Sequence, residues 1–207
     1  MCVDYRKLNK ITRKNAYPIP RIDDTLDELG DASVFTGLDL LAGYNQIGMT
    51  RRVQERSAFI TKFGHYEYKQ MSFGLCNAPA TFQSAMNELF RDIIGKGVLV
   101  YLDDIIIYAK SYKEHNELLR KVLGKIRQAN MRIKSKKCVI GVWKLHYLGF
   151  IIDHERIQMD PEKIKVIQQF LRPASKDRNQ GISRSNPVLP KIYQTLFGIS
   201  CTTQHAA

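Results

Sequence analysis

The sequence has few of the features that mark secreted, membrane or zinc-binding proteins. Its four cysteines are scattered over 207 residues with no Cys-x-x-Cys pair, which argues against a disulfide framework and a zinc finger. No apolar stretch approaches the roughly 20 residues that cross a membrane, and the first residues lack the apolar core of a secretory signal. We therefore expect an intracellular protein, cytoplasmic or nuclear, with no membrane partner.

Acidic residues are in the minority. The chain has 20 aspartates and glutamates against 32 lysines and arginines, a formal net charge of +12. Such an excess favours a polyanionic partner such as nucleic acid, although a merely solvated basic surface is the alternative. With 44% hydrophobic residues, the chain is long enough to bury a core of one domain or slightly more.

Two adjacent carboxylates, Asp103 and Asp104, interrupt the otherwise apolar segment 98–108. The Val- and Ile-rich runs on either side predict two buried strands joined by a tight turn, with the acidic pair at its tip. Neighbouring carboxylates repel each other when partly buried, and Mg²⁺ relieves this while also binding substrate phosphates. The pattern favours a phosphoryl-transfer site, and an ordinary Asp-containing turn is the alternative.

A third acid, Asp39, stands in another apolar run, residues 34–41. If the two segments form neighbouring strands, the three carboxylates meet and can hold two magnesium ions about 4 Å apart.

Hairpins and helices alternate irregularly, which predicts an α+β protein with a mainly antiparallel sheet covered on one face by helices. We expect an extended segment at residues 17–20, where two prolines stand. Helices are expected at 22–30, 77–90, 112–130 and 161–171, and strand segments at 57–63, 65–71 and 139–152.

Six motifs occur in a definite order between residues 2 and 150. They are residues 2–9 (Cys-Val-Asp-Tyr-Arg-Lys-Leu-Asn), 17–22 (Tyr-Pro-Ile-Pro-Arg-Ile), 38–47 (Leu-Asp-Leu-Leu-Ala-Gly-Tyr-Asn-Gln-Ile), 73–83 (Phe-Gly-Leu-Cys-Asn-Ala-Pro-Ala-Thr-Phe-Gln), 101–104 (Tyr-Leu-Asp-Asp) and 147–150 (Tyr-Leu-Gly-Phe). Together they resemble the reverse transcriptase (RNA-directed DNA polymerase) domain of a Ty3/gypsy-type LTR retrotransposon Pol polyprotein. The resemblance implies a polymerase palm, with a ferredoxin-like antiparallel sheet and a partial fingers region, over residues 1–174.

The resemblance also implies a catalytic centre. Asp39, Asp103 and Asp104 would be the catalytic residues and would hold two Mg²⁺ ions, for which Mn²⁺ could substitute. A primer 3′-hydroxyl would then attack the α-phosphate of a deoxynucleoside triphosphate (dNTP) on an RNA or DNA template.

Nucleotide-binding residues follow from the same resemblance. Leu40 would offer its backbone carbonyl to a metal ion, and Tyr44 would be the steric gate that excludes a ribose 2′-hydroxyl. Phe73 and Gly74 would form a turn against the incoming nucleotide and the template. For Tyr44, core packing is the alternative, and for Gly74 a plain turn glycine.

A basic run, residues 134–137, falls where the family carries a cation near the triphosphate. Lys134 is taken as the candidate, with Lys136 and Lys137 as further possibilities and a solvated basic face as the alternative. The family's fingers also carry a Lys and an Arg that clamp the triphosphate, at positions preceding Met1. We therefore expect charge neutralisation to rest on metal and this run, and activity to be impaired.

The resemblance also implies contacts with template and primer. Gln83 would contact the template from a helix, with a solvent-facing position as the alternative. Trp143 is expected either in the core or stacked on a base. The remaining candidates are Tyr101 beside the primer end and, in a hairpin that positions the 3′ end, Leu145, Tyr147, Leu148 and Gly149.

Residues 175–207 show no helical or alternating period. Reading the region around 188–198 one base later can restore the family's downstream segment, so we expect a poorly structured, frame-shifted tail. Two functions follow: a polymerase domain that acts on template–primer duplex and dNTP, or a catalytically impaired nucleic-acid-binding remnant of a retrotransposon polyprotein. The oligomeric state stays open.

Overall fold

The computed structural model describes residues 3–154, 156–162 and 165. These residues divide into two units, the first comprising 3–145 with 153–154 and the second 146–152 with the described residues from 156 onward. Mixed helices and antiparallel sheets confirm the predicted α+β class.

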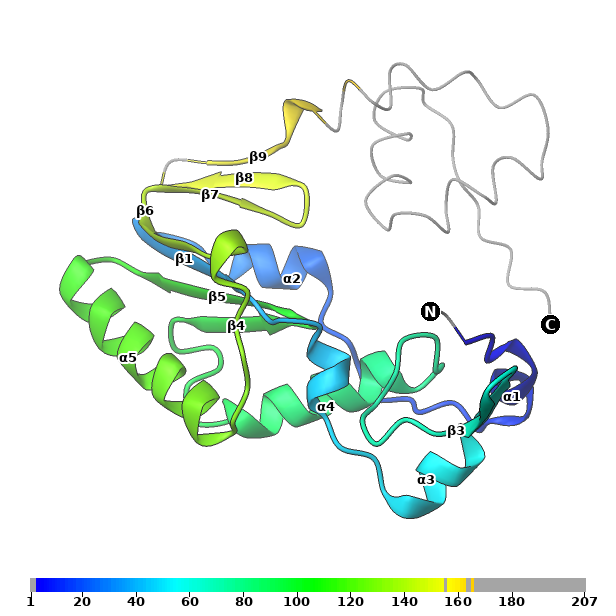
Figure 1. Ribbon diagram of the computed structural model, residues 1–207. Helices are drawn as coiled ribbons and strands as arrows, with labels where there is room; N and C mark the ends of the chain where they lie inside the picture. The colour runs from blue at the N-terminus through cyan, green and yellow to red at the C-terminus, as the bar shows by residue number, and fades with distance from the viewer. Residues whose placement is uncertain (1–2, 155, 163–164, 166–207) are drawn as a thin grey trace, which may run out of the picture. The chain divides into compact units, whose positions relative to one another are not determined.

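The first unit is built on a four-stranded sheet in the order β4-β5-β1-β6, with every neighbouring pair antiparallel (Figure 1). Its strands are β1 (Val34–Asp39), β4 (Val98–Tyr101), β5 (Asp104–Ala109) and β6 (Val139–Val142). As predicted, β4 and β5 form a tight hairpin, in which Tyr101 lies opposite Asp104.

Two helices, α4 (Ala78–Leu89) and α5 (Tyr112–Gln128), pack on one face of this sheet. Side chains of alternate strand residues point to the same face, so Leu38, Ile105 and Ile107 reach the same core cluster as Phe82 of α4 and Val122 of α5. Each is at most 2% exposed, and burying a side chain of this size stabilises the fold by roughly 1.5–3 kcal/mol. Because this core includes Leu38 and Ile105, it supports the end of the sheet where Asp39 and Asp104 lie.

Short elements gather at the other end of the first unit, where Figure 1 shows α1, α3 and β3 together, away from α5. The Tyr5 hydroxyl donates to the carbonyl of Ser57 at 3.1 Å and joins the start of α1 to the end of α3. The remaining elements of the first unit are α1 (Arg6–Ile11), α2 (Ile22–Asp27), η1 (Gly43–Gln46), α3 (Arg51–Arg56), β2 (Phe59–Thr61), β3 (Gly64–Tyr66) and η2 (Ser135–Lys137).

A second sheet has three strands in the order β7-β8-β9. They are β7 (Lys144–Tyr147), β8 (Phe150–Asp153) and β9 (Ile157–Met159). Of the predicted helix at 161–171, residues 161, 162 and 165 are helical. The rest of that helix and the predicted tail at 175–207 lie outside the described residues.

Candidate active site

Three carboxylates meet at one end of the main sheet. The register of β1 and β5 sets Asp39 directly opposite Asp104. Asp103 precedes Asp104 in the hairpin turn, and its carbonyl accepts a hydrogen bond from the amide of Leu40 at 3.0 Å. The expected pairing of the two acid-bearing segments as neighbouring strands is therefore confirmed.

The cluster carries more negative charge than its surroundings compensate. Burial, and then the charges of Asp39 and Asp103, raise the pKa of Asp104 to about 6. Burial and the charge of Asp39 also raise the pKa of Asp103. Within the described chain, the Oδ1 atom of Asp103 is buried and has no hydrogen-bond partner. A cation would relieve the repulsion among the three carboxylates and would give Asp103 Oδ1 a partner.

One lysine of the basic run reaches the cluster. Lys137, at the end of η2, places its Nζ 3.0 Å from Asp39 Oδ2, and this hydrogen bond, with the attraction of Asp39, raises the pKa of Lys137. Lys134 contributes its backbone instead, since its amide donates to the Asp39 carbonyl at 2.8 Å while its side chain is exposed. Of the three candidate lysines, the structure brings Lys137 to the carboxylates, and nothing in the sequence separates it from Lys134.

The cluster is not a closed metal cage. Throughout the described residues, no three His, Cys, Asp or Glu side chains are arranged to hold a metal ion. Mg²⁺, however, commonly takes only one or two carboxylates and completes its shell with water and substrate phosphates. The unpartnered oxygen of Asp103 and the ammonium held at Asp39 indicate a site that accepts positive charge. The oxygen donors therefore suit Mg²⁺.

An aromatic group borders the carboxylates. The Tyr44 ring lies 5.0 Å from that of Phe73 and 5.5 Å from that of Phe82, and burial and then the charge of Asp103 raise its pKa. The backbone at Gly43, directly before Tyr44, passes close to Asp103 and Phe82. Only glycine allows this, because a Cβ there would collide with Asp103 Oδ1 and stand 2.7 Å from Phe82. Gly43 and Phe82 are not among the predicted site residues, although a glycine directly before Tyr44 was a usable signal.

Gln83 holds the turn that carries the acids. Its side chain is 0% exposed. Its Nε2 donates to the carbonyl of Val100 at 3.0 Å and to Asn87 Oδ1 at 2.9 Å, and its Oε1 accepts from the amide of Leu102 at 2.8 Å. Leu102 has a positive φ of 52°, a strained value for a leucine. The alternative of a solvent-facing Gln83 is therefore wrong. Because the side-chain amide of Gln83 is hydrogen-bonded inside the protein, the residue supports the turn and is not free to contact a template.

Gly74 lies in a loop against the N-terminal segment. Its φ of +92° favours glycine, and its carbonyl accepts a 2.7 Å hydrogen bond from Asn9 Nδ2. The Phe73 ring beside it is 54% exposed. Phe73 and Gly74 thus place an exposed aromatic ring, and next to it a residue without a side chain, near Tyr44.

Leu40, Tyr101 and Leu145 lie in the main sheet or against it. Leu40 has its side chain in the core, at 2% exposed, while Tyr101 pairs with Asp104 across the hairpin. Leu145 is buried beneath β1, where its Cδ1 would lie 3.2 Å from a Cβ on Gly37.

The candidates beyond Leu145 belong to the second unit. Tyr147 ends β7, and Leu148 and Gly149 form the turn to β8 with φ values of 48° and 89°. Trp143, in contrast, belongs to the first unit and lies just before β7; it is 57% exposed and packs edge-to-face on Tyr112 at 5.0 Å. The interpretation of Trp143 as a core residue is therefore wrong.

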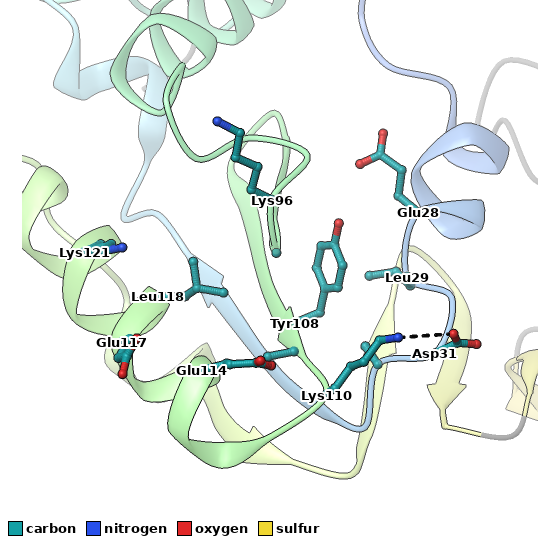
Figure 2. Close-up of a pocket in the computed structure, with 13 residues that line it drawn as sticks. Glu28, Leu29, Asp31, Lys96, Tyr108, Lys110, Glu114, Glu117, Leu118 and Lys121 are labelled. Atoms are coloured by element: carbon teal, nitrogen blue, oxygen red, sulfur yellow. Dashed lines mark hydrogen bonds and ion pairs between the residues drawn. The ribbon is translucent and has the colours of Figure 1, made fainter.

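A cavity of about 500 Å³ lies away from this site (Figure 2). It opens beside the far end of β5, around Tyr108, and its wall mixes acids with lysines, including an Asp31–Lys110 pair at 3.4 Å. None of the predicted site residues lines it.

Comparison with known proteins decides the family. Residues 1–152 match the family described as reverse transcriptase (RNA-dependent DNA polymerase). The chain belongs to this family. It is 44% identical over 176 residues to the Retrovirus-related Pol polyprotein from transposon 297 of Drosophila melanogaster, covering 85% of this chain and 16% of the polyprotein.

Other relatives agree with this assignment and with its Ty3/gypsy character. The Retrovirus-related Pol polyprotein from transposon gypsy of Drosophila melanogaster is 39% identical over 84% of this chain and 17% of its own length. A foamy viral protease-reverse transcriptase in complex with RNA/DNA hybrid has the same fold, with a TM-score of 0.77 at 23% identity over 93% of this chain and 25% of that one. The chain thus spans under a fifth of the length of the two Drosophila polyproteins. Among its described helices none is long and apolar enough to cross a membrane.

Proposed function

We propose that this chain catalyses RNA-directed DNA synthesis by nucleotidyl transfer. The 3′-hydroxyl of a primer on an RNA or DNA template attacks the α-phosphate of a dNTP, forming a phosphodiester bond and releasing pyrophosphate. The observation that carries the proposal is the strand register that sets Asp39 opposite Asp104, beside the buried, unpartnered oxygen of Asp103. The polyprotein relatives, and the RNA/DNA hybrid bound by the foamy viral enzyme, support a nucleic-acid substrate.

Each residue has a role that its position supports. Asp39, Asp103 and Asp104 would hold two Mg²⁺ ions, or Mn²⁺ in their place. When bound, such ions lower the pKa of the attacking hydroxyl and stabilise charge on the departing pyrophosphate. Lys137 adds a positive charge at the same carboxylates. The Tyr44 ring, held against Phe73 and Phe82, would exclude a ribose 2′-hydroxyl.

Primer extension on an RNA template with Mg²⁺ tests the proposal. The full chain should extend the primer with dNTPs, and Asp103→Asn should abolish extension, because it removes a metal-binding charge. Asp92→Asn is the matched control, since Asp92 lies on the surface in a pair with Lys125. Extension that survives Asp103→Asn would refute the assignment. Template–primer binding without extension by the unsubstituted chain would support the impaired, nucleic-acid-binding alternative.

A further inference from the structure

The loop that contains Phe73 and Gly74 is tied to the N-terminal segment by one asparagine side chain. Asn9, in α1, donates from Nδ2 to the carbonyl of Gly74 at 2.7 Å, and its Oδ1 accepts from the amide of Cys76 at 2.9 Å. The donor and the acceptor of one side-chain amide are therefore both used on the same loop. These partners lie 65 and 67 residues away along the chain, so the position of the loop depends on a distant segment.

A second asparagine makes the reciprocal connection. Asn77, directly before α4, donates from Nδ2 to the carbonyl of Arg13 at 2.9 Å, and its Oδ1 accepts from the amide of Asn15 at 2.9 Å. Asn9 thus holds the loop from the N-terminal segment, and Asn77 holds the N-terminal segment from the end of the loop. These two residues, with their four hydrogen bonds, form an asparagine clamp.

Asn77 makes these bonds in place of capping its own helix. It is the N-cap residue of α4, where an asparagine side chain usually accepts a hydrogen bond from the first turn of the helix. The side chain of Asn77 makes no such bond. Departures of this kind from a local preference are expected at functional sites, so the clamp serves more than the start of α4.

The clamped loop lies beside the proposed nucleotide site. The exposed ring of Phe73 lies 5.0 Å from that of Tyr44. The backbone of Gly74 passes close to Tyr5, whose Cδ2 would be 3.5 Å from a Cβ on that glycine. The loop therefore connects the N-terminal segment, through Gly74, to Tyr44, through Phe73.

We propose that Asn9 and Asn77 are positioning residues that determine how strictly the site selects the sugar of the incoming nucleotide. By fixing the loop, the clamp keeps the Phe73 ring against Tyr44, and Tyr44 keeps the place that a ribose 2′-hydroxyl would need. When the clamp is lost, the loop shifts, Tyr44 gains freedom and a ribonucleotide fits. This inference rests on the proposed function of Tyr44, but the hold of the clamp on the loop requires no catalysis.

Substitution by aspartate tests the clamp with little change of shape. Asn9→Asp replaces the Nδ2 donor by a carboxylate oxygen, which repels the carbonyl of Gly74. Asn77→Asp loses the bond to Arg13 in the same way. Aspartate is as good an N-cap as asparagine and suits the positive end of a helix, so α4 should stay intact in Asn77→Asp. Asn130→Asp, at an exposed residue just after α5, is the matched control.

Nucleotide binding measures sugar selection without catalysis. A template–primer whose primer ends in a dideoxynucleotide accepts the next nucleotide but cannot be extended. Anisotropy of this fluorescent template–primer, bound to the full chain with Mg²⁺ and challenged with heparin, measures how strongly the matching dNTP or ribonucleotide stabilises the complex. The ratio of the two affinities should fall roughly fivefold in Asn9→Asp and in Asn77→Asp, about the effect of one hydrogen bond. It should not change in Asn130→Asp, and a general loss of folding would weaken both nucleotides alike.

Labelling of Cys76 with iodoacetamide, read by mass spectrometry, measures the hold on the loop itself. The Cys76 thiol is half-buried. Asn9→Ala removes both bonds from Asn9, so Cys76 should react roughly tenfold faster, while Cys138, also half-buried, keeps its rate.

Two results would overturn the proposal. The first is an unchanged labelling rate of Cys76 in Asn9→Ala. The second is an unchanged ratio of affinities in both aspartate variants of a chain that discriminates between the two nucleotides. A chain that binds no dNTP, or binds both nucleotides equally, would instead refute the proposed function of Tyr44 and the selectivity that rests on it.

Discussion

Asp104 has a pKa of about 6 because burial and two neighbouring carboxylates penalise its ionised form. An unfolded aspartate has a pKa near 3.9, so between these values the folded state binds the extra proton. Without metal, the contribution of Asp104 to stability is therefore greatest below about 3.9 and is lost as the pH rises through about 6. A bound cation reverses this preference by favouring the charged cluster.

Removal of Lys137 should therefore strengthen the response of the fold to Mg²⁺. Lys137→Met takes away the ammonium at Asp39 and leaves the three carboxylates to the metal alone. We expect Mg²⁺ to raise the melting temperature of this variant more than that of the unsubstituted chain at pH 7.5. The gain should shrink at pH 5.5, where Asp104 is largely protonated. Thermal unfolding with and without a chelator measures both effects.

Lys136→Met is the matched control, because Lys136 is exposed and no salt bridge within the described residues involves it. Its response to Mg²⁺ should equal that of the unsubstituted chain, and Asp104→Asn should lose most of the response. A Mg²⁺ effect that is the same in all four proteins would show that the ion does not bind at this cluster.

At the scale of elements, one helix supports the hairpin that carries the acids. Gln83 of α4 bonds to the backbone of Val100 and Leu102, on either side of Tyr101. The Leu102 turn is strained, and the hydrogen bonds from the helix offset that strain. The position of Asp103 therefore depends on α4 as well as on the hairpin itself.

Gln83→Leu should accordingly impair catalysis more than binding. It fits a similar volume but leaves the amide of Leu102 and the carbonyl of Val100 without their partner, so we expect a loss of about 1–3 kcal/mol in stability. Primer extension should slow, with template–primer affinity nearly unchanged. Gln128→Leu, at the exposed end of α5, should alter neither. Equal activity of Gln83→Leu and the unsubstituted chain would contradict a positioning role.

The strands of the main sheet and the long helices could be predicted because their patterns are strong, whereas α1 and α3 could not. The β4–β5 hairpin follows from Val and Ile runs around Asp103, and α4 from Asn77 and a proline in its first turn. In contrast, α1 and α3 have six residues each and bury none of them, so no apolar period marks them. Lys137 reaches Asp39 because of the turn of η2, and no residue pattern predicts that turn. Gln83 was misjudged because burial of a polar residue depends on partners far along the chain.

At the scale of the whole molecule, the clustered acids and the basic residues are distributed differently. Strand pairing collects the acids at one end of the sheet, while the net charge of +12 comes from lysines and arginines spread over the chain. The acid cluster would repel a nucleic-acid backbone, so under the proposed function affinity comes from the basic surface and the acids contribute through metal.

Template–primer affinity should therefore fall steeply with salt. Each phosphate neutralised by a lysine or arginine releases condensed counterions, and log K falls with log salt by about 0.9 for each contact on a duplex. If six phosphates are neutralised, affinity should drop by roughly 10³ between about 50 mM and 200 mM salt. Anisotropy titrations at several salt concentrations measure this slope. Asp92→Asn, which removes an exposed acid on the surface, should leave the slope unchanged. An affinity that does not change with salt would contradict binding through the basic surface.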